Sequence, residues 1–477
     1  MNSRELLKSS LFYTVVQYLV LGIGFVRGLF TAKYLGPALM GSYGLVTLIL
    51  EYLRFSNLGI SNAMNLEVSV NKNKAEKSAY VQNVINNAFS YMVVIALLLG
   101  AVAVVFHFFA PGFAAAEFSK YTFAIFFIGM VGQIKVFAVL YARLFDKYRF
   151  INLIELASAV VLCLLVVLFI ADYQLNAVIG SMIASSLLTL SLCLVLIHRK
   201  VSLHIDWRLL RKLATIGIPL LLCVLFEKVF QTVDRMLIVR FLTREDLGFF
   251  TLAYTVLSNT LVVLSSFTFL NYPKFLERFN MSNYSGEARD RLWHDLKRYS
   301  TVYSGVIIAI ALIGLILVEP FIKILLPAYG PSIVIYRILM IGSIFEMISY
   351  FAGAYLVSNK YQNLILWMLA ISTLTSLVLN YFAIHMGWGL VGIAVATSFS
   401  MSLYAALKIG FVLAKIGTFS LLRLTDFYKK YILLLAFVIP VLLWLPAHLY
   451  LAMPVFLVLY LSELLEVKRR LLPVKSR

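Results

Sequence analysis

The chain has 477 residues, of which 62% are hydrophobic and 13% are charged, and its mean hydropathy is +0.92. Soluble domains contain roughly 45–50% apolar and about 25% charged residues, so this composition excludes a soluble globular protein. The formal net charge of +19 would suit a nucleic-acid-binding protein. However, the basic residues stand in short segments between long apolar stretches, as membrane topology requires. We therefore expect a multi-pass membrane protein that has no nucleic-acid partner.

Apolar stretches of about 20 residues, long enough to cross a ~30 Å hydrocarbon core, recur along the whole chain. The first of them is too long for a signal peptide and has no small-residue cleavage site, so we interpret it as a membrane helix. We predict an all-α polytopic protein with about fourteen transmembrane helices. The predicted spans are approximately 10–34, 41–64, 81–109, 121–142, 151–171, 175–197, 213–241, 246–270, 300–318, 332–356, 362–382, 389–413, 431–447 and 449–465.

The distribution of basic residues predicts the orientation. Roughly 29 of the 41 Lys and Arg fall in alternate connections and in the C-terminal tail, about 5 in the opposite connections and about 7 inside spans. Because cytoplasmic loops carry the excess of Lys and Arg, we expect a multi-pass protein of the cytoplasmic (inner) membrane with both termini in the cytoplasm. Two of the cytoplasmic segments, 205–214 and 286–299, are amphipathic, and we expect them to lie along the headgroups as separate helices.

The two halves of the chain share a short motif. AKYLGPALMGSYG at 32–44 and VRFLTREDLGFFT at 239–251 align at an offset of 207 residues (240 − 33). An even number of predicted spans separates the copies, so both halves insert with the same orientation. This predicts two pseudo-symmetric lobes of about six helices each around a central cavity, followed by about two C-terminal helices. The matched pairs are Lys33 and Arg240, Tyr34 and Phe241, Leu35 and Leu242, Gly41 and Gly248, and Tyr43 and Phe250.

Charged residues stand inside the predicted spans, where each costs at least ~2.5–3.5 kcal/mol on insertion scales. Several repeat at helical spacing on one face, so we expect them to face the cavity. Since cations outnumber anions, the set favours an anionic substrate, such as one with a phosphate, a diphosphate or acidic sugars. The candidate substrate-binding residues are Arg27, Arg54, Lys135, Lys228, Arg235 and Arg337, and the candidates for ion coupling or charge pairing are Glu51, Glu227, Asp234 and Glu346.

An alternative interpretation is that these charges pair with one another and bind nothing. Glu51 and Arg54 stand at i and i+3 and could pair within one helix. Arg337 and Glu346 lie on opposite faces of their predicted span, so the two side chains are not both expected in one lumen.

Enzymatic and metal chemistry are not supported by the sequence. No Walker A sequence is present, the three cysteines stand in apolar stretches, and the six histidines are scattered. We therefore expect no cofactor and no metal, with H⁺ or Na⁺ coupling through the carboxylates left open.

Five segments together resemble the Wzx-like polysaccharide flippases of the superfamily that also holds MATE drug exporters and lipid II flippases. The resemblance lies in the order and spacing of the segments, and it covers nearly the whole chain. The segments are AKYLGPALMGSYG (32–44), NLGISNAM (57–64), IGIPLLL (216–222), VDRMLIVRFLTREDLGFFTLAY (233–254) and GLVGIAVATS (389–398).

The resemblance implies a MATE-like bundle with an N-terminal lobe at 1–200, a C-terminal lobe at 201–418, and two further helices with a basic tail at 419–477. It implies alternating access by a flippase that moves an undecaprenyl-diphosphate-linked oligosaccharide to the outer leaflet, for O-antigen, capsule, exopolysaccharide or teichuronic-type polymers. Expected partners are this lipid-linked oligosaccharide, membrane lipids and other polysaccharide-assembly proteins.

Two other functions remain open. A MATE-type multidrug exporter would favour an acidic cavity, and span 1 here has no carboxylate. A membrane sugar polymerase or ligase would need a substantial external loop, whereas every external connection of this chain is short.

Overall fold

The computed structural model describes residues 3–109, 116–269, 288–416, 420–444 and 446–471. Within these ranges all regular structure is helical, and nine helical stretches are long and apolar enough to cross a membrane. Residues 270–287, which include part of the predicted connection between spans 246–270 and 300–318, and the end of the basic tail lie outside the described residues. The main helices are α1 (Ser3–Leu53), α2 (Ile60–Asn71), α3 (Ser78–Phe109), α4 (Ala116–Leu144), α5 (Tyr148–Ile197), α6 (Trp207–Phe241), α7 (Arg244–Phe269), α9 (Ala288–Leu325), α10 (Gly330–Ile348), α11 (Tyr350–Ser358), α12 (Gln362–His385), α13 (Gly389–Lys415), α14 (Leu421–Trp444) and α15 (Ala452–Leu471).

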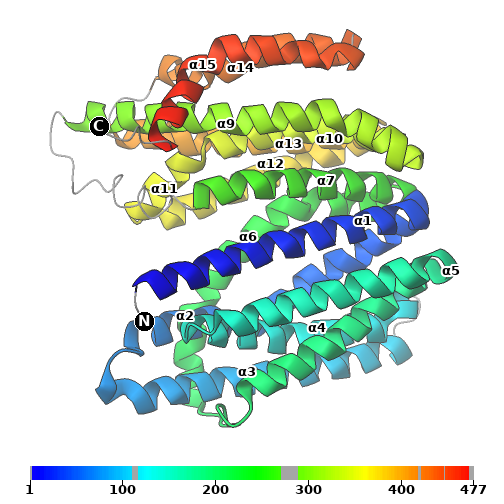
Figure 1. The fold of residues 1–477 in the computed structure, drawn as a ribbon, viewed down its shortest axis with the longest axis vertical. Helices are drawn as coiled ribbons and strands as arrows, with labels where there is room; N and C mark the ends of the chain where they lie inside the picture. The colour runs from blue at the N-terminus through cyan, green and yellow to red at the C-terminus, as the bar shows by residue number, and fades with distance from the viewer. Residues whose placement is uncertain (1–2, 110–115, 270–287, 417–419, 445, 472–477) are drawn as a thin grey trace. The chain divides into compact units, whose positions relative to one another are not determined.

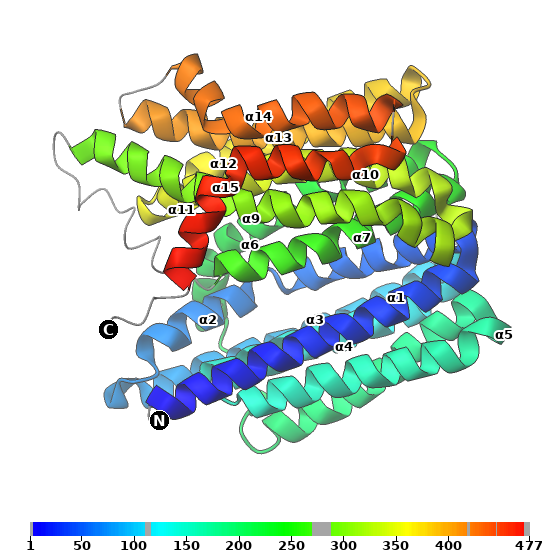
Figure 2. The same cartoon turned by 45° about the horizontal axis from the view of Figure 1, so that its top comes forward.

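Two of the long stretches contain a turn. The backbone of α1 leaves the helical region at Gly36, where φ is 65°, and Pro37 opens the next helical segment. The backbone of α5 breaks in the same way at Gln174, where φ is 46°. Each of these elements is therefore two helices in succession, and Figure 2 shows α1 turning back toward α2. The total of fourteen spans stays a prediction.

The chain forms two compact units, 1–225 and 226–477, and the division falls inside α6. The first turns of α6 belong to the first unit because Leu209 and Leu213 are buried in its hydrophobic core with residues of α3 and α4. The predicted boundary lay earlier, at 200/201, in the connection before this helix. The division into lobes at 1–200, 201–418 and 419–477 stays a prediction.

A polar network also ties the start of α6 to the first unit. The Tyr80 hydroxyl donates to Glu67 Oε2 at 2.8 Å, and Lys212 Nζ lies 2.8 Å from the Tyr80 oxygen and 3.1 Å from Glu67 Oε1. Burial raises the pKa of Glu67, but the hydrogen bonds from Tyr80 and Lys212 lower it more, so the pKa falls below its usual value. The network therefore links α2, α3 and α6 through a carboxylate that stays ionised at neutral pH.

Each unit is a layered helix bundle (Figure 1). In the first unit α1 packs against α5, α4 packs against both α3 and α5, and α2 packs against α3. In the second unit α10 is central and contacts α7, α9 and α13, while α12 packs on α13. The C-terminal helices α14 and α15 lie side by side, and α15 packs on α9.

The expectation of two separate amphipathic helices is wrong. Segment 205–214 is continuous with the membrane-spanning part of α6, and the described part of segment 286–299 is continuous with α9. Protein covers much of their apolar faces: Leu213 and Leu296 are both fully buried, and Trp293 packs on Phe427 at a ring distance of 5.7 Å. At the start of the first segment, Ile205 and Trp207 remain exposed.

The predicted span 41–64 is not one helix. It stops at Leu53, continues as a short 3-10 turn over Arg54–Asn57, and restarts at Ile60. Asn57 holds the break, because its Oδ1 accepts the Gly59 N–H at 2.9 Å and its Nδ2 donates to the Arg54 carbonyl at 3.1 Å. The helical periodicity of this span is therefore interrupted after Leu53.

The repeated motif marks a helix boundary in both halves. At the offset of 207 residues Gly36 aligns with Thr243, which stands between α6 and α7. Gly36 turns the chain through its positive φ. Thr243 does so as a helix cap, accepting the Asp246 N–H at 3.2 Å while Asp246 Oδ2 accepts the Thr243 N–H at 3.1 Å. Different local chemistry thus gives a turn at the same point of the repeat.

Candidate functional site

A cavity of about 360 Å³ lies within the first unit, between α1, α4 and both halves of α5. Each of these four helical segments contributes side chains spaced by three or four residues, so one face of each segment lines the cavity. The space exists partly because small residues, including Gly24, Gly132 and Ala159, stand where larger side chains would fill it. The charged residues of the lining are Arg27, Lys135 and Glu155.

Arg27 is held in the first half of α1, one turn after Gly24. Its Nε is buried and makes no hydrogen bond within the described part of the chain. A buried guanidinium nitrogen without an acceptor is costly, and an anionic ligand would supply the missing partner. Arg27 is thus the strongest single indication that the cavity receives an anion.

Lys135 reaches the same cavity from α4, and its Nζ lies 3.1 Å from Glu155 Oε2 on α5. Both side chains keep partial exposure, 32% for Lys135 and 26% for Glu155. The pair is therefore accessible to a ligand, and the cavity retains one net positive charge from Arg27. Glu155 was not predicted as a site residue, although a carboxylate inside span 151–171 was the signal that could have revealed it.

Hydroxyl groups form the α5 wall of the cavity. Ser158 Oγ and Thr189 Oγ1 lie 2.7 Å apart, and Ser185 Oγ donates to the Ser158 carbonyl at 3.0 Å. These bonds join the two halves of α5 across the turn at Gln174. They also fix the wall from which Glu155 projects.

Glu51 and Arg54, predicted as a possible helical pair, stand on either side of the end of α1. Glu51 lies in the last helical turn, whereas Arg54 begins the 3-10 turn and has an exposed side chain. Neither residue lines the cavity of the first unit. Their assignment to substrate binding or ion coupling stays a prediction.

In the second unit, Asp234 and Arg235 on α6 engage one another and their neighbours. Asp234 is 1% exposed, its Oδ1 lies 3.9 Å from Arg235 Nε, and its Oδ2 accepts from Thr397 at 3.4 Å. The Arg235 guanidinium stacks 4.1 Å above the Tyr254 ring. These contacts favour a structural role for the pair, while Lys228, about two turns earlier, has partners of its own within the protein.

A second charged cluster in this unit joins Glu227 of α6, Glu346 of α10 and Lys408 of α13. The charges of both carboxylates act on Lys408, whose ammonium lies 4.2 Å from the centre of the Tyr404 ring. The assignment of Glu227 and Glu346 to ion coupling or charge pairing stays a prediction. Lys408 was not predicted, although a lysine in the middle of span 389–413 was a visible signal.

Arg337 is engaged by Glu319 of α9. Its Nη2 donates to Glu319 Oε2 at 2.8 Å, and Lys323 Nζ holds the other carboxylate oxygen at 2.6 Å. Only 10% of the Arg337 side chain is exposed, and Glu319 supplies a carboxylate partner within the unit. The arrangement favours a structural pair over a substrate contact, and it accounts for the placement of Arg337 on the face opposite Glu346.

The Glu319→Gln variant is expected to lose about 2 kcal/mol of stability, because the largely buried Arg337 would lose its counter-charge. Lys323→Gln is the matched control, since its side chain is 66% exposed and exposed pairs contribute less than about 1 kcal/mol. Thermal unfolding in detergent measures the stability of both variants. Equal losses in the two variants would contradict a structural role for the Arg337 pair.

Comparison with known proteins agrees with this architecture. The model of the polysaccharide biosynthesis protein family matches residues 6–277, more than half of the chain. An inward-facing multidrug resistance MATE transporter of the MOP superfamily superposes with a TM-score of 0.68 at 12% identity, covering 83% of this chain and 94% of that one. The lipid II flippase MurJ in an inward closed conformation superposes with a TM-score of 0.65 at 13% identity, covering 96% of this chain and 99% of that one.

A third solved structure, a MOP superfamily transporter from Pyrococcus furiosus, is described as having a binding pocket of reversed polarity. It gives a TM-score of 0.54 at 12% identity and covers 85% of this chain and 93% of that one. No protein of curated function matches the sequence. At these identities the structural likeness is one of fold, whereas the family match rests on the sequence itself. The chain is a multi-pass membrane protein with the MATE-like and MurJ-like fold, and it belongs to the polysaccharide biosynthesis protein family.

Proposed function

We propose that this protein is a flippase that moves an undecaprenyl-diphosphate-linked oligosaccharide from the inner to the outer leaflet of the cytoplasmic membrane for cell-surface polysaccharide synthesis. The family match supports a role in polysaccharide production, and the fold is shared with a flippase of another lipid-linked substrate. The observation that carries the proposal is the cavity of the first unit, where Arg27 has a buried nitrogen without an acceptor beside Lys135.

The physical task of a flippase explains why such a cavity is useful. A diphosphate with sugars cannot enter hydrocarbon without replacing its hydration, because buried charges without partners cost several kcal/mol. Arg27 offers a planar fork for phosphate oxygens, and Lys135 adds a second donor when the ligand competes with Glu155. The prenyl tail meanwhile remains in the lipid.

In this proposal the carboxylates of the second unit couple transport to ions. The charges of Glu227 and Glu346 both act on Lys408, so binding of H⁺ or Na⁺ would change the charge balance of three helices at once. We further propose fourteen spans, with both termini in the cytoplasm and alternating access as the mechanism. Arg54, Lys228 and Arg235 remain candidates for further substrate contacts.

A MATE-type multidrug exporter is the second candidate, because a MATE transporter shares the fold with a TM-score of 0.68. Exporters of cationic drugs need anionic groups that contact the cargo. The cavity of the first unit instead contains two cations and one carboxylate, which favours an anionic cargo.

Reconstitution in proteoliposomes tests the proposal. A fluorescently labelled undecaprenyl-diphosphate oligosaccharide is placed in both leaflets, and a membrane-impermeant reagent that modifies the sugar reports the accessible fraction over time. Protein-dependent passage of the protected fraction to the accessible leaflet is expected. Absence of such passage for several oligosaccharides, together with efflux of a cationic dye, would support the exporter instead.

A further inference from the structure

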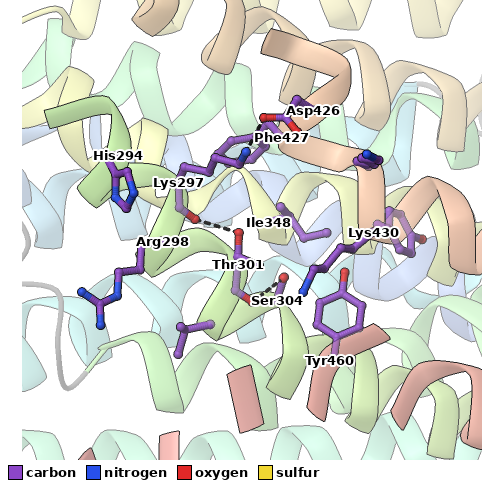
Figure 3. Close-up of a pocket in the computed structure, with 13 residues that line it drawn as sticks. His294, Lys297, Arg298, Thr301, Ser304, Ile348, Asp426, Phe427, Lys430 and Tyr460 are labelled. Atoms are coloured by element: carbon purple, nitrogen blue, oxygen red, sulfur yellow. Dashed lines mark hydrogen bonds and ion pairs between the residues drawn. The ribbon is translucent and has the colours of Figure 1, made fainter. Parts of the chain in front are cut away.

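The second unit contains a cavity of about 350 Å³ between α9, α14 and α15 (Figure 3). Its charged side chains are engaged within the protein. Lys297 pairs with Asp426, which joins α9 to α14, and Arg298 and Lys430 have interaction partners of their own. These contacts favour a role in joining the helices over a role in binding a ligand.

Aromatic rings from two other helices of this unit meet at the C-terminal ends of α6 and α12. Phe241, the last residue of α6, contacts Tyr381 and His385 of α12 edge to face, with ring centroids 6.0 and 5.9 Å away. The centroids of the Tyr381 and His385 rings lie 4.0 Å apart. Edge-to-face contacts of this length are favourable, so the three side chains form one group, which we call the aromatic cluster.

The aromatic cluster is exposed even though its rings touch one another. Phe241 is 43% exposed and Tyr381 is 44% exposed, and His385 is also exposed. The His385 Nδ1 lies 3.0 Å from the Tyr381 carbonyl oxygen, which holds the imidazole on the last turn of α12. Since each ring is held by its neighbours, the cluster presents a preformed surface that needs little ordering to receive a ligand.

A basic side chain stands beside the aromatic cluster. The Arg240 guanidinium lies 5.8 Å from the centre of the Phe241 ring. Arg240 is exposed and makes no ion pair with the residues that the structure describes. In the proposed orientation α6 and α12 both run outward from cytoplasmic ends, so the cluster and Arg240 lie on the outer side. The positive-inside distribution does not require an arginine there.

The equivalent point of the first unit shows what membrane anchoring alone requires. At the repeat offset of 207 residues Tyr34 aligns with Phe241, and it is 40% exposed. Its ring stacks at 6.3 Å on Phe30 of the same helix. A single exposed aromatic residue near a helix end is typical of the membrane interface. The second unit adds a tyrosine and a histidine from another helix, which anchoring does not need.

We propose that the aromatic cluster binds a sugar ring of the transported oligosaccharide on the outer side, with a preference for an acidic sugar. The C–H groups of a pyranose carry partial positive charge and are attracted to the negative face of an aromatic ring. Its hydroxyls match the Tyr381 hydroxyl and the His385 ring nitrogens, and Arg240 adds donors for a carboxylate. Lipid chains would use only the apolar ring faces. The proposal rests on the flippase function and adds a site separate from the cavity of the first unit.

A titration of the full-length protein in detergent with trigalacturonate, followed by saturation-transfer difference NMR, tests the site without a transport step. The Phe241→Leu/Tyr381→Leu variant should bind roughly tenfold more weakly, since each aromatic contact contributes a factor of about two to ten. Leucine keeps an apolar side chain for lipid and removes the aromatic face. Tyr34→Leu is the matched control, and its affinity should change less than about twofold. Phe241→Tyr keeps the ring and should bind as the wild type does.

The acidic preference has its own test. The methyl ester of trigalacturonate has the same rings without charge, and it should bind the wild type about two- to fivefold more weakly than the acid. Arg240→Gln should remove this difference. Equal binding of acid and ester by the wild type would show that Arg240 does not select an acidic sugar.

Other outcomes decide the site itself. Absence of binding by the wild type, or equal weakening by Tyr34→Leu and the double variant, would overturn the proposal. Loss of binding in Arg27→Gln but not in the double variant would also overturn it, because the probe would then occupy the cavity of the first unit. Failure of the wild type to translocate the lipid-linked oligosaccharide in proteoliposomes would instead contradict the flippase function, since binding in detergent is measured independently.

Discussion

Replacing Arg27 by glutamine is expected to slow translocation of the lipid-linked oligosaccharide roughly 10- to 100-fold. A hydrogen bond to a charged group contributes about 1.5–3 kcal/mol, which corresponds to this range if it forms as the headgroup crosses. Arg27 is the residue for this test because its Nε lacks a partner within the described part of the chain. Its loss would therefore remove the proposed ligand contact without breaking an ion pair among the described residues. Initial rates in proteoliposomes measure the effect.

Two controls make the Arg27 result specific. Lys33→Gln removes one charge from an exposed position of α1 outside the cavity, and it should leave the rate within about twofold. Arg27→Lys keeps the charge but not the planar fork, so it should recover part of the rate. If Arg27→Gln and Lys33→Gln transport equally well at equal protein levels, the cationic cavity is not on the substrate route.

Lys135 needs a different design, because removing it alone leaves Glu155 unpaired. The Lys135→Gln/Glu155→Gln variant removes both charges and retains the volume of the cavity. We expect it to fold normally and to transport more slowly if Lys135 contacts the substrate. Unchanged transport would make the pair a structural link between α4 and α5.

Replacing Gly59 by alanine is expected to destabilise the protein by at least about 3 kcal/mol, the largest stability effect predicted here. Gly59 has a φ of +78°, and a Cβ at this position would lie 2.1 Å from the carbonyl oxygen of Gly217. The obstructing atom belongs to the backbone of α6, so it cannot rotate away. The backbone strain of an alanine at positive φ therefore adds to the steric overlap of its Cβ with the Gly217 carbonyl oxygen. Thermal unfolding and the yield of monodisperse protein in detergent are the measurements.

The partner glycine separates these two causes. Gly217→Ala meets the Gly59 carbonyl oxygen at 2.2 Å but lies in the regular helix α6, so it should cost less than Gly59→Ala. Gly22→Ala in α1 has open space around its Cβ and should be neutral or slightly stabilising, since alanine favours a helix by about 1 kcal/mol over glycine. A Gly59→Ala protein as stable as Gly22→Ala would show that α2 and α6 do not approach as closely as described.

The sequence by itself determined the class of the protein and two of the points where its helices turn. Long apolar stretches satisfy their backbone hydrogen bonds only as helices in a membrane, so composition predicts the all-α fold directly. The turns at Gly36 and Thr243 were visible in the repeat, because positive φ and helix caps depend on a few adjacent residues. The candidates Arg27 and Lys135 were visible for a similar reason, since a charge inside an apolar stretch is conspicuous without any structure.

Only the tertiary structure decided which of those charges act together. Lys135 meets Glu155 twenty residues later, Arg337 meets Glu319, and the charges of two carboxylates from other helices act on Lys408. Such partners depend on how helices pack, which local periodicity does not contain. Whether an apolar side chain on an amphipathic helix contacts lipid or protein was decided in the same way. Burial of Leu213 would be favourable in either environment, and only the packing of the bundle places it against protein.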